Sequence, residues 1–450
     1  MTNKNLANGI QSNRLAAEEY DINFSDIHPP LNQHEALVAA DRCYFCHDAP
    51  CVTACPTEID IPMFIRQIAT DNTLGSAKTI FDQNILGGMC ARVCPTETLC
   101  EQACVREIAE GKPVNIGLLQ RFATDEAMRE SKQFYDRAEK TGKKIAVVGA
   151  GPAGLACSHR LAMHGHNVVV YDAREKSGGL NEYGIASYKT VNGFAQAEVD
   201  YVTSIGGIEI VHGKKLGSDL SLSELQEFHD AVFLSVGLSG VNAIGMNADN
   251  VEGIHDAVDF IAKLRQSQSL EDVPIGRRVV VIGGGMTAID AAVQAKLLGA
   301  EEVTLCYRRG KESMNASEYE QELATTKGVV IRHWLKPVGI EDEKGVLSSI
   351  DLEYTQVKNG KLSGTGNKTT LMADQVLFAI GQTFSASDVD GSSTSIELVN
   401  GRIKVDEEFR TSAAGVWAGG DCISMGEDLT VSAVAHGRDA AESINRTLSK

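Results

Sequence analysis

Eight of the eleven cysteines lie between Cys43 and Cys104, in two runs with regular spacing. The first run is Cys43-x2-Cys46-x4-Cys51-x3-Cys55-Pro56, and the second is Cys90-x3-Cys94-Pro95-x4-Cys100-x3-Cys104. Thiolates are soft ligands that suit iron and sulfide, and a cubane cluster takes four of them. In two-cluster sites the cysteine before a proline ligates the other cluster. The spacing therefore predicts Cys43, Cys46 and Cys51 on one cluster and Cys55 on the other.

Structural zinc is the alternative interpretation of these cysteines. Zinc sites favour paired C-x2-C knuckles, and Cys43-x2-Cys46 is the one such pair in this window. The N-terminal residues lack the apolar core of a signal peptide, and we expect a cytoplasmic protein. Disulfides are rare in that compartment, so dense cysteines indicate metal or cluster ligation. The isolated Cys157, Cys306 and Cys422 are expected to be small packing residues.

A glycine pattern typical of dinucleotide binding begins at Gly149 and ends at Gly154. It follows an apolar strand expected at 145–148 and opens an expected helix. In this context the first glycine makes the turn, Gly151 lets the backbone approach a pyrophosphate, and Gly154 allows close helix–strand packing. Asp172 ends the next expected strand, where a carboxylate can accept ribose hydroxyls.

A second glycine turn has Gly283, Gly285 and Ala288 at the three small positions. The strand after it ends in Tyr307-Arg308-Arg309 and carries no acid there. Because a 2′-phosphate needs cationic donors where NAD needs a carboxylate, the two arginines favour NADP(H). The alternative is that they form a solvated surface pair.

These motifs predict an α-helical cysteine domain followed by α/β structure with two nested Rossmann-like domains. Helical spacing covers 13–20, 34–41, 61–69 and 116–131, which predicts a helical domain over 1–140. We expect a discontinuous FAD-binding domain at 141–265 and 376–450, interrupted by an NAD(P)H-binding domain at 266–375. In this arrangement the strand VLFAI, which precedes Gly381, rejoins the first nucleotide domain, and Asp421 faces a second part of its ligand.

The overall composition excludes several classes of protein. With 42 basic and 60 acidic residues the net charge is −18, which argues against a nucleic-acid partner. No stretch reaches the roughly 18 apolar residues of a membrane span. We find no Ser-His-Asp set and no HExxH motif, and we assign no catalytic residue.

The cysteine segments resemble a known enzyme family. The sequences CYFCHDAPCVTACPTEIDIPMFI, GGMCARVCPTETLCEQAC and VNIGLLQRFAT are similar to the N-terminal part of dihydropyrimidine dehydrogenase. The resemblance covers about residues 30–445 and is greatest to the separate flavin subunit of the bacterial NAD(P)-dependent enzyme. The small subunit of glutamate synthase shares the same plan, but CPTEID and Gln120 favour the pyrimidine enzyme.

The resemblance implies two [4Fe–4S] clusters with specific ligands. One cluster would be held by Cys43, Cys46, Cys51 and Cys104, and the other by Cys55, Cys94, Cys100 and Gln120. Cys90 would be left unliganded, although spacing alone favours Cys90 over Gln120.

The resemblance also implies the dinucleotide contacts. Those around FAD would be Gly149, Ala150, Gly151, Pro152, Ala153, Asp172, Gly179, Leu180, Lys189, Leu216, Asp421, Leu429, Thr430 and Val431. Those around the pyridine nucleotide would be Gly285, Met286, Thr287, Ala288, Arg308, Arg309, Ala379, Ile380 and Gly381. Two positions depart from the family: its YGIP reads YGIA at 183–186, and Asn315 replaces a basic residue of some relatives, which weakens the NADP preference.

The resemblance implies that the chain is an electron-input subunit. It would take hydride from NAD(P)H onto FAD and pass single electrons through two clusters to another protein. The FMN barrel that reduces uracil or thymine, about 250 residues in such folds, has no counterpart here. We therefore expect a hetero-oligomer with an FMN-containing catalytic subunit. The rivals are a glutamate synthase small subunit, a ferredoxin-type reductase, and a noncatalytic redox-sensing or scaffold protein.

Overall fold

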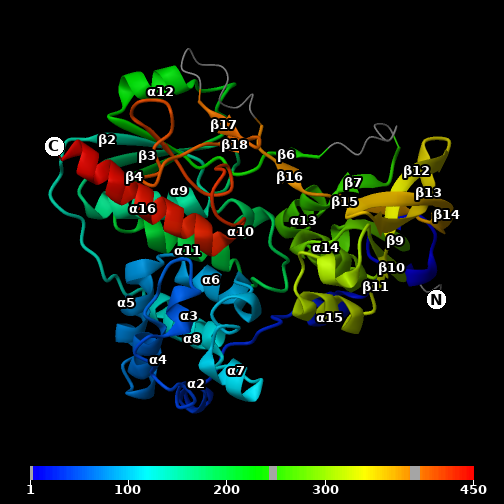
Figure 1. The fold of residues 1–450 in the computed structure, drawn as a ribbon, viewed down its shortest axis with the longest axis horizontal. Helices are drawn as coiled ribbons and strands as arrows, with labels where there is room; N and C mark the ends of the chain where they lie inside the picture. The colour runs from blue at the N-terminus through cyan, green and yellow to red at the C-terminus, as the bar shows by residue number, and fades with distance from the viewer. Residues whose placement is uncertain (1–3, 243–250, 386–395, 450) are drawn as a thin grey trace. The chain divides into compact units, whose positions relative to one another are not determined.

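The computed structural model describes residues 4–242, 251–385 and 396–449. The chain forms two compact units (Figure 1). The first unit comprises Met1–Ile27, Tyr183–Val191 and Val241–Gln382. The second unit comprises His28–Glu182, Asn192–Gly240 and Thr383–Lys450. The cysteine-rich helices and the first glycine turn therefore belong to the same compact unit.

Short helices and the loops between them carry the eight clustered cysteines, all in the second unit. Asn32 caps the first of these helices by accepting a hydrogen bond from Glu35 N (3.0 Å), and Asp60 does the same for Met63 N (3.1 Å). The apolar face that follows Asp60 is buried at Phe64 and Ile65. The helices are α2 (Gln33–Ala40), α3 (Pro50–Thr53), α4 (Ile61–Ala69), α5 (Thr73–Gln83), α6 (Gly87–Val93), η2 (Thr96–Thr98), α7 (Val105–Glu110) and α8 (Ile116–Arg129).

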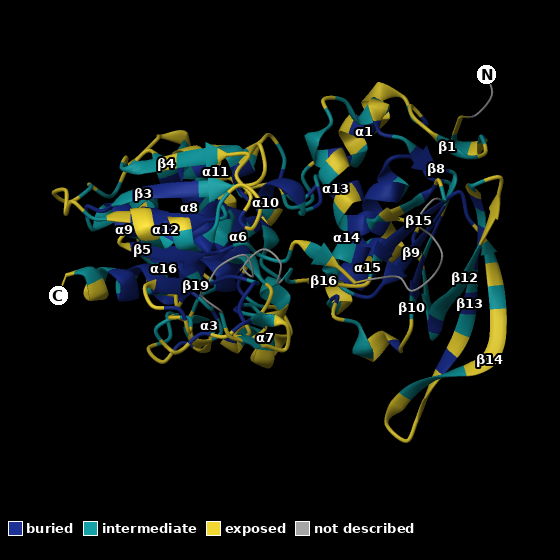
Figure 2. Cartoon of the chain, turned by 90° about the horizontal axis from the view of Figure 1, so that it is seen from above, coloured by how far each residue is buried: buried dark blue, intermediate teal, exposed yellow. Residues whose placement is uncertain are grey.

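A five-stranded parallel sheet completes the second unit, in the order β19-β5-β2-β3-β4. Four of its strands are largely buried apolar runs, as expected for a sheet covered on both faces, whereas the edge strand at Ile208–His212 contains no buried residue (Figure 2). The strands are β2 (Lys144–Val148), β3 (Asn167–Asp172), β4 (Ile208–His212), β5 (Ala231–Leu234) and β19 (Val416–Ala418). The helices are α9 (Pro152–Met163), α10 (Leu180–Tyr183), α11 (Phe194–Thr203), α12 (Leu222–Phe228) and α16 (Thr430–Leu448).

Helix α16 packs along α9, the helix that follows the first glycine turn (Figure 1). A Cβ atom at Gly437 of α16 would lie 2.0 Å from the carbonyl oxygen of Ala153, so only glycine allows this approach. The first turn of α9 is thereby held between its own strand and the C-terminal helix.

The first unit repeats the same design around a second parallel sheet, in the order β11-β10-β9-β15-β7. The strands are β7 (Ile254–Asp256), β9 (Arg278–Gly283), β10 (Glu302–Tyr307), β11 (Val330–His333) and β15 (Gln375–Ala379). The helices are α1 (Ala17–Asn23), α13 (Ala257–Gln266), α14 (Met286–Leu297) and α15 (Glu318–Thr326), with η1 (Lys4–Leu6), η3 (Leu270–Asp272) and η4 (Lys311–Ser313). An antiparallel sheet adds β12 (Leu335–Glu343), β13 (Val346–Lys358) and the largely exposed β14 (Lys361–Met372) (Figure 2).

The prediction that VLFAI rejoins the first nucleotide domain is wrong. This segment forms β15, which pairs in parallel with β9 on one side and β7 on the other. The chain enters the second unit only at Thr383. Val376 and Leu377 are completely buried, so the run is apolar on both faces and its pattern does not distinguish the two sheets.

The N-terminal residues also differ from the expected domain boundary. Residues 1–27 belong to the first unit, whereas the sequence placed them in a helical domain over 1–140. Strand β1 (Ile10–Gln11) pairs antiparallel with β8 (Ile275–Gly276). The buried Arg14 donates to the carbonyl of Ile275 (2.9 Å) and to that of Lys4 (2.9 Å). A buried guanidinium needs such acceptors, and they fix this segment.

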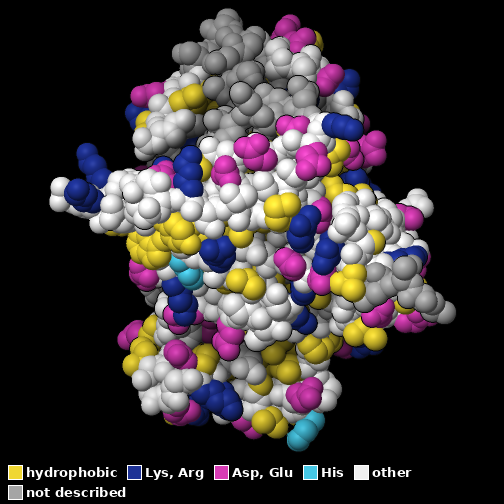
Figure 3. Space-filling model, turned by 90° about the vertical axis from the view of Figure 1, so that its right-hand side faces the viewer, with side chains coloured by type: hydrophobic (Ala, Val, Ile, Leu, Met, Phe, Trp, Pro, Cys, Tyr) yellow, Lys and Arg dark blue, Asp and Glu magenta, His cyan; other side chains and the backbone are white. Residues whose placement is uncertain are grey.

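The remaining strands are short: β6 (Gly240–Val241), β16 (Gln382–Thr383), β17 (Leu398–Val399) and β18 (Arg402–Ile403). None of the described helices combines the length and apolar character that crossing a membrane requires. On the face drawn in Figure 3, acidic and basic side chains are interspersed and form no extended basic surface.

Candidate functional site

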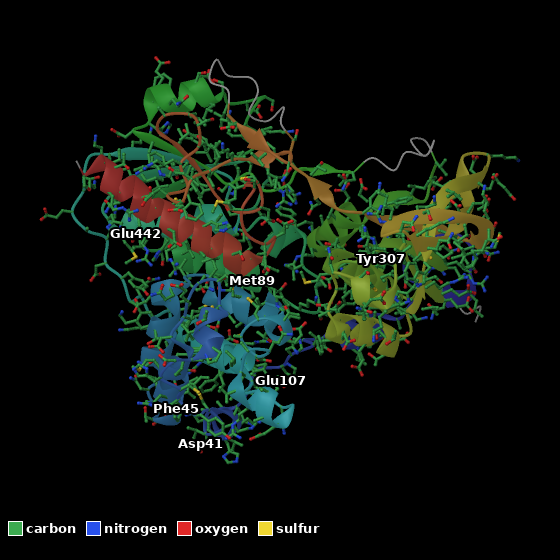
Figure 4. The ribbon with its side chains drawn as sticks, viewed as in Figure 1. Asp41, Phe45, Met89, Glu107, Tyr307 and Glu442 are labelled. Carbon is green, nitrogen blue, oxygen red and sulfur yellow. The ribbon has the colours of Figure 1, made fainter. Side chains whose placement is uncertain are left out.

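Four of the predicted cluster ligands surround one cavity of the second unit. Cys43, Cys46, Cys51 and Cys104 line it, and its empty volume, counted out to the solvent, is about 380 Å³. The loop before α3 brings in the first two cysteines, and Cys104 caps α7. Phe45, with a left-handed φ of 51°, turns its N–H toward Cys43 Sγ (3.4 Å) (Figure 4 labels Phe45).

The guanidinium of Arg106, which also lines this first cavity, lies 4.1 Å from the ring centroid of Tyr44. A cation at the wall suits a ligand that carries negative charge. The donor set and this charge fit an anionic iron–sulfur cluster.

The other predicted ligands surround a second cavity in the same unit. Cys55, Cys94, Cys100 and Gln120 line it, together with Cys90. The Gln120 Nε2 donates to the carbonyl of Gly87 (2.8 Å), which leaves the amide oxygen as the atom available to a ligand. The structure thus separates the candidate ligands into the two sets that the family resemblance implies, with Cys90 as a fifth candidate in the second.

The protein surroundings raise the pKa of four of these thiols above the usual range. Burial raises the pKa of Cys51 to about 12 and also raises the pKa of Cys43 and Cys100. The pKa of Cys94 is raised by a hydrogen bond with Cys90 and by burial. Cluster binding must therefore release protons.

The described residues contain no group of three or more His, Cys, Asp or Glu side chains that could hold a single metal ion. A zinc site would bring four ligands to about 2.0–2.3 Å from one point.

The first glycine turn joins β2 to α9 and has the geometry of a pyrophosphate loop. Gly149 has a φ of +103°, and a Cβ there would lie 2.3 Å from the carbonyl oxygen of Ser235. A Cβ at Gly154 would lie 1.9 Å from the Gly149 carbonyl oxygen, so this position serves helix–strand packing. At Gly151 the only neighbour within 4 Å would be Gly179 Cα, at 3.8 Å, so this backbone is open. Pro152 and Ala153 begin α9.

Asp172 supports this turn directly. Its carboxylate accepts hydrogen bonds from Ala150 N (2.7 Å) and Arg174 N (2.7 Å). The Gly178 N–H donates to the Ala150 carbonyl (2.7 Å), which places Gly179 and Leu180 beside the turn. The carboxylate expected at a ribose therefore also fixes the loop that precedes it. Leu216 is buried in the apolar core of the same sheet.

Lys189, predicted near FAD, lies in the first unit. Its ammonium pairs with Asp290 Oδ1 (2.8 Å) and Glu320 Oε1 (2.8 Å) and is almost completely buried. Burial lowers the pKa of Lys189, but the two carboxylates raise it above its usual value. This side chain is committed to an internal ion cluster of the first unit.

The second glycine turn joins β9 to α14, which begins at Met286 and includes Thr287 and Ala288. A Cβ at Gly285 would meet no heavy atom within 4 Å, so the backbone faces open space. A Cβ at Gly284 would lie 2.4 Å from the ring of Tyr307 (labelled in Figure 4), which lies against the turn.

Two further groups flank the second turn. Arg308 and Arg309 are exposed, while their carbonyls accept from Thr355 Oγ1 (2.7 Å) and Trp334 N (3.1 Å). Their backbone is therefore fixed and their guanidinium groups are accessible. Ala379 ends β15 beside Gly283, and Ile380 and Gly381 follow it; a Cβ at Gly283 would lie 2.4 Å from the Ala379 carbonyl oxygen.

The segment from Asp421 to Val431 brings the first turn and the cysteines together. Burial raises the pKa of Asp421 to about 7, and the nearby Asp428 adds to this. Thr430 Oγ1 donates to Asn181 Oδ1 (3.0 Å), which joins the start of α16 to α10; Leu429 precedes it. Val431 is also a wall residue of the second cysteine cavity. One residue therefore belongs to the segment expected at FAD and to a cluster cavity.

Sequence reasoning missed a buried carboxylate between α11 and α6. Glu198 is 1% exposed, and its Oε1 accepts from Met89 N (2.9 Å) at the start of the helix that carries Cys90 (Figure 4 labels Met89). Its Oε2 has no described hydrogen-bond partner. Burial raises the pKa of Glu198 to about 8, although Arg92 opposes the shift. A single glutamate in an amphipathic helix gives no sequence signal of this role.

Comparisons with known proteins agree with this geometry. Residues 20–132 match the family described as dihydropyrimidine dehydrogenase domain II, 4Fe-4S cluster. Residues 143–437, well over half of the chain, match the family described as pyridine nucleotide-disulphide oxidoreductase. The chain belongs to the pyridine nucleotide-disulphide oxidoreductase family. The predicted fold class, a helical cluster domain followed by nested dinucleotide folds, is confirmed.

Named relatives of this oxidoreductase cover almost its whole length. It is 35% identical over 423 residues to NAD-dependent dihydropyrimidine dehydrogenase subunit PreT of Escherichia coli K12, covering 94% of this chain and 97% of the relative. It is 33% identical over 446 residues to the glutamate synthase [NADPH] small chain of the same strain, covering 94% and 93%. The resemblance to dihydropyrimidine dehydrogenase subunits is confirmed.

The structure of T. acidophilum thioredoxin reductase matches with a TM-score of 0.54 at 20% identity, covering 68% of this chain and 100% of that one. This likeness concerns the fold alone. Together the family matches identify the oxidoreductase as an NAD(P)H-dependent flavin iron–sulfur enzyme.

Glu198 predicts a pH dependence of stability. Its pKa is about 8 in the folded protein against about 4.3 when unfolded, so between these values only the folded state holds the proton. The stabilisation is complete below pH 4.3 and is lost as the pH rises through 8. The melting temperature of wild type relative to Glu198→Gln should fall between pH 5.5 and 8.5. A constant difference over this range, or the same trend in the exposed control Glu209→Gln, would contradict the assignment.

Proposed function

We propose that the chain is the electron-input subunit of a dihydropyrimidine dehydrogenase. When bound, FAD accepts hydride from NAD(P)H and two [4Fe–4S] clusters carry the electrons singly to a partner subunit. That partner holds FMN and reduces uracil or thymine to the 5,6-dihydropyrimidine. This chain positions the donor, the flavin and the clusters.

The observation that carries the proposal is the double role of Val431. It follows Leu429 and Thr430 in the segment assigned to FAD, and it lines the cavity of Cys55, Cys94 and Cys100. All these residues belong to one compact unit. A chain that only stored a flavin, or only sensed redox state through its thiols, would not need this shared wall.

We assign Cys43, Cys46, Cys51 and Cys104 to one cluster, and Cys55, Cys94, Cys100 and Gln120 to the other. Their separation into two cavities supports this assignment. The amide of Gln120 replaces a negative thiolate, and a less negative ligand set should raise the potential of the second cluster.

The first glycine turn, with Asp172, Gly179, Leu180 and Asp421, would bind FAD. The positive end of α9 would then face the pyrophosphate. The second turn, with Arg308, Arg309 and the residues after β15, would bind the pyridine nucleotide. The open backbone at Gly151 and at Gly285 supports both assignments.

A glutamate synthase small subunit is the alternative, because a named relative of that kind matches almost the whole chain at 33% identity. The same set of cofactors would then pass electrons to a different acceptor. The acceptor, and not the cofactor set, distinguishes the two functions.

Reconstitution tests the proposed function. The chain alone, under anaerobic conditions, should lose its flavin absorbance on addition of NADH or NADPH without consuming uracil. Addition of an FMN-containing dihydropyrimidine dehydrogenase subunit should yield dihydrouracil, measured chromatographically. Uracil reduction by the chain alone, or productive pairing only with a glutamate synthase large subunit, would overturn the proposal.

The exposed arginines predict the coenzyme preference. Because hydrogen bonds to charged groups contribute about 1.5–3 kcal/mol, replacing Arg308 and Arg309 with Gln should lower kcat/KM for NADPH about tenfold or more. The value for NADH should change less than about twofold. Stopped-flow flavin reduction measures both, with the exposed Lys327→Gln as the control. Equal losses for the two coenzymes would remove these arginines from 2′-phosphate recognition.

The assignment of Gln120 as a ligand predicts how its substitution changes the reduction potential of the second cluster. Gln120→Cys adds a thiolate to the second cavity, so the potential of one cluster should fall in an EPR-monitored redox titration. Cys90→Ala is the matched control, since it removes a thiol from the same wall, and its iron content should equal that of wild type. An unchanged potential in Gln120→Cys, or iron loss in Cys90→Ala, would reverse the two roles.

A further inference from the structure

The hydroxyl of Thr57 lies within hydrogen-bonding distance of a predicted cluster ligand. Its Oγ1 is 3.3 Å from Cys55 Sγ, and this is its described hydrogen bond. Thr57 is 0% exposed and Cys55 is 9% exposed, so water does not compete for the contact. In the free thiol either atom can donate. A thiolate bound to iron has no proton, so the hydroxyl must then be the donor.

The backbone of Thr57 is held by the C-terminal helix. Arg438 of α16 donates to the Thr57 carbonyl (2.8 Å) and to the carbonyl and side-chain oxygens of Gln83 (3.1 and 2.7 Å). The same helix begins with the segment that lines the second cavity at Val431. The hydroxyl is therefore presented to Cys55 by a rigid contact between two elements of one unit.

We propose that Thr57 is a positioning residue that raises the reduction potential of the second cluster through an O–H···S bond to Cys55. The inference rests on the proposed function, in which Cys55 ligates that cluster. Reduction adds negative charge to the cluster and its sulfurs, and a donor to sulfur stabilises the reduced form more than the oxidised form. The first cluster provides an internal reference. In the described contacts its ligand Cys43 accepts a hydrogen bond only from the backbone N–H of Phe45.

The test compares the holoprotein with Thr57→Val, which removes the hydroxyl at similar volume, and Thr57→Ser, which keeps it. At a fixed potential the ratio of reduced to oxidised second cluster should fall about tenfold in Thr57→Val, a shift of about 59 mV for one electron. Thr57→Ser should titrate as wild type. Thr53→Val, which changes the exposed threonine at the end of α3, is the control and should also be unchanged.

EPR-monitored titration separates the possible outcomes. An intact second cluster with the wild-type potential in Thr57→Val overturns the inference, as does an equal shift of both clusters. If Thr57→Val does not assemble, pulsed EPR of wild type and Thr57→Ser in H2O and D2O decides, because the reduced second cluster must couple to an exchangeable proton. Absence of that coupling overturns the inference. Absence of iron from wild type would instead overturn the proposed function.

Discussion

The structure depends on the contact between α16 and the cysteine-bearing helices. Arg438 donates hydrogen bonds to the carbonyl of Thr57, which follows the first cysteine run, and to the carbonyl of Gln83, which precedes the second. Gly437 beside it allows α16 to touch the first turn of α9. Because a half-buried guanidinium requires its acceptors, the contact sets the distance between the glycine turn and the second cavity.

The chemistry of the two cavities is unequal, and the difference follows from their surroundings. The first is lined by Arg106 and by the exposed Tyr44, and most of its cysteines are half-buried. The second takes part of its wall from Val431 and is lined by the neutral amide of Gln120 beside four thiols. In the proposed assignment, the cation beside the first cluster and the neutral ligand of the second would shift the two reduction potentials independently.

Much of this arrangement could be predicted from the sequence. The two glycine turns are predictable because the strand, turn and helix that define each one are adjacent in the sequence. The cysteine spacing limits the cluster ligands to a few possible sets. The placement of VLFAI could not be predicted, because a strand buried on both faces has the same apolar pattern in either sheet. Glu198 and Arg438 were missed because their partners, Met89 and Thr57, are distant in sequence. The assignment of Gln120 came from resemblance, since an amide ligand has no spacing rule.

The chain passes between the two units at five points, after residues 27, 182, 191, 240 and 382. The first unit is therefore assembled from three separate stretches of chain, and its β1 strand and Arg14 come from the beginning of the sequence. No single cut yields either unit as a continuous fragment. Expression of a shortened gene that starts at the linker near residue 140 would remove β1 and Arg14 from the nucleotide-binding fold as well as all eight clustered cysteines. The protein is thus a poor candidate for domain dissection, and its parts are best separated by point substitution.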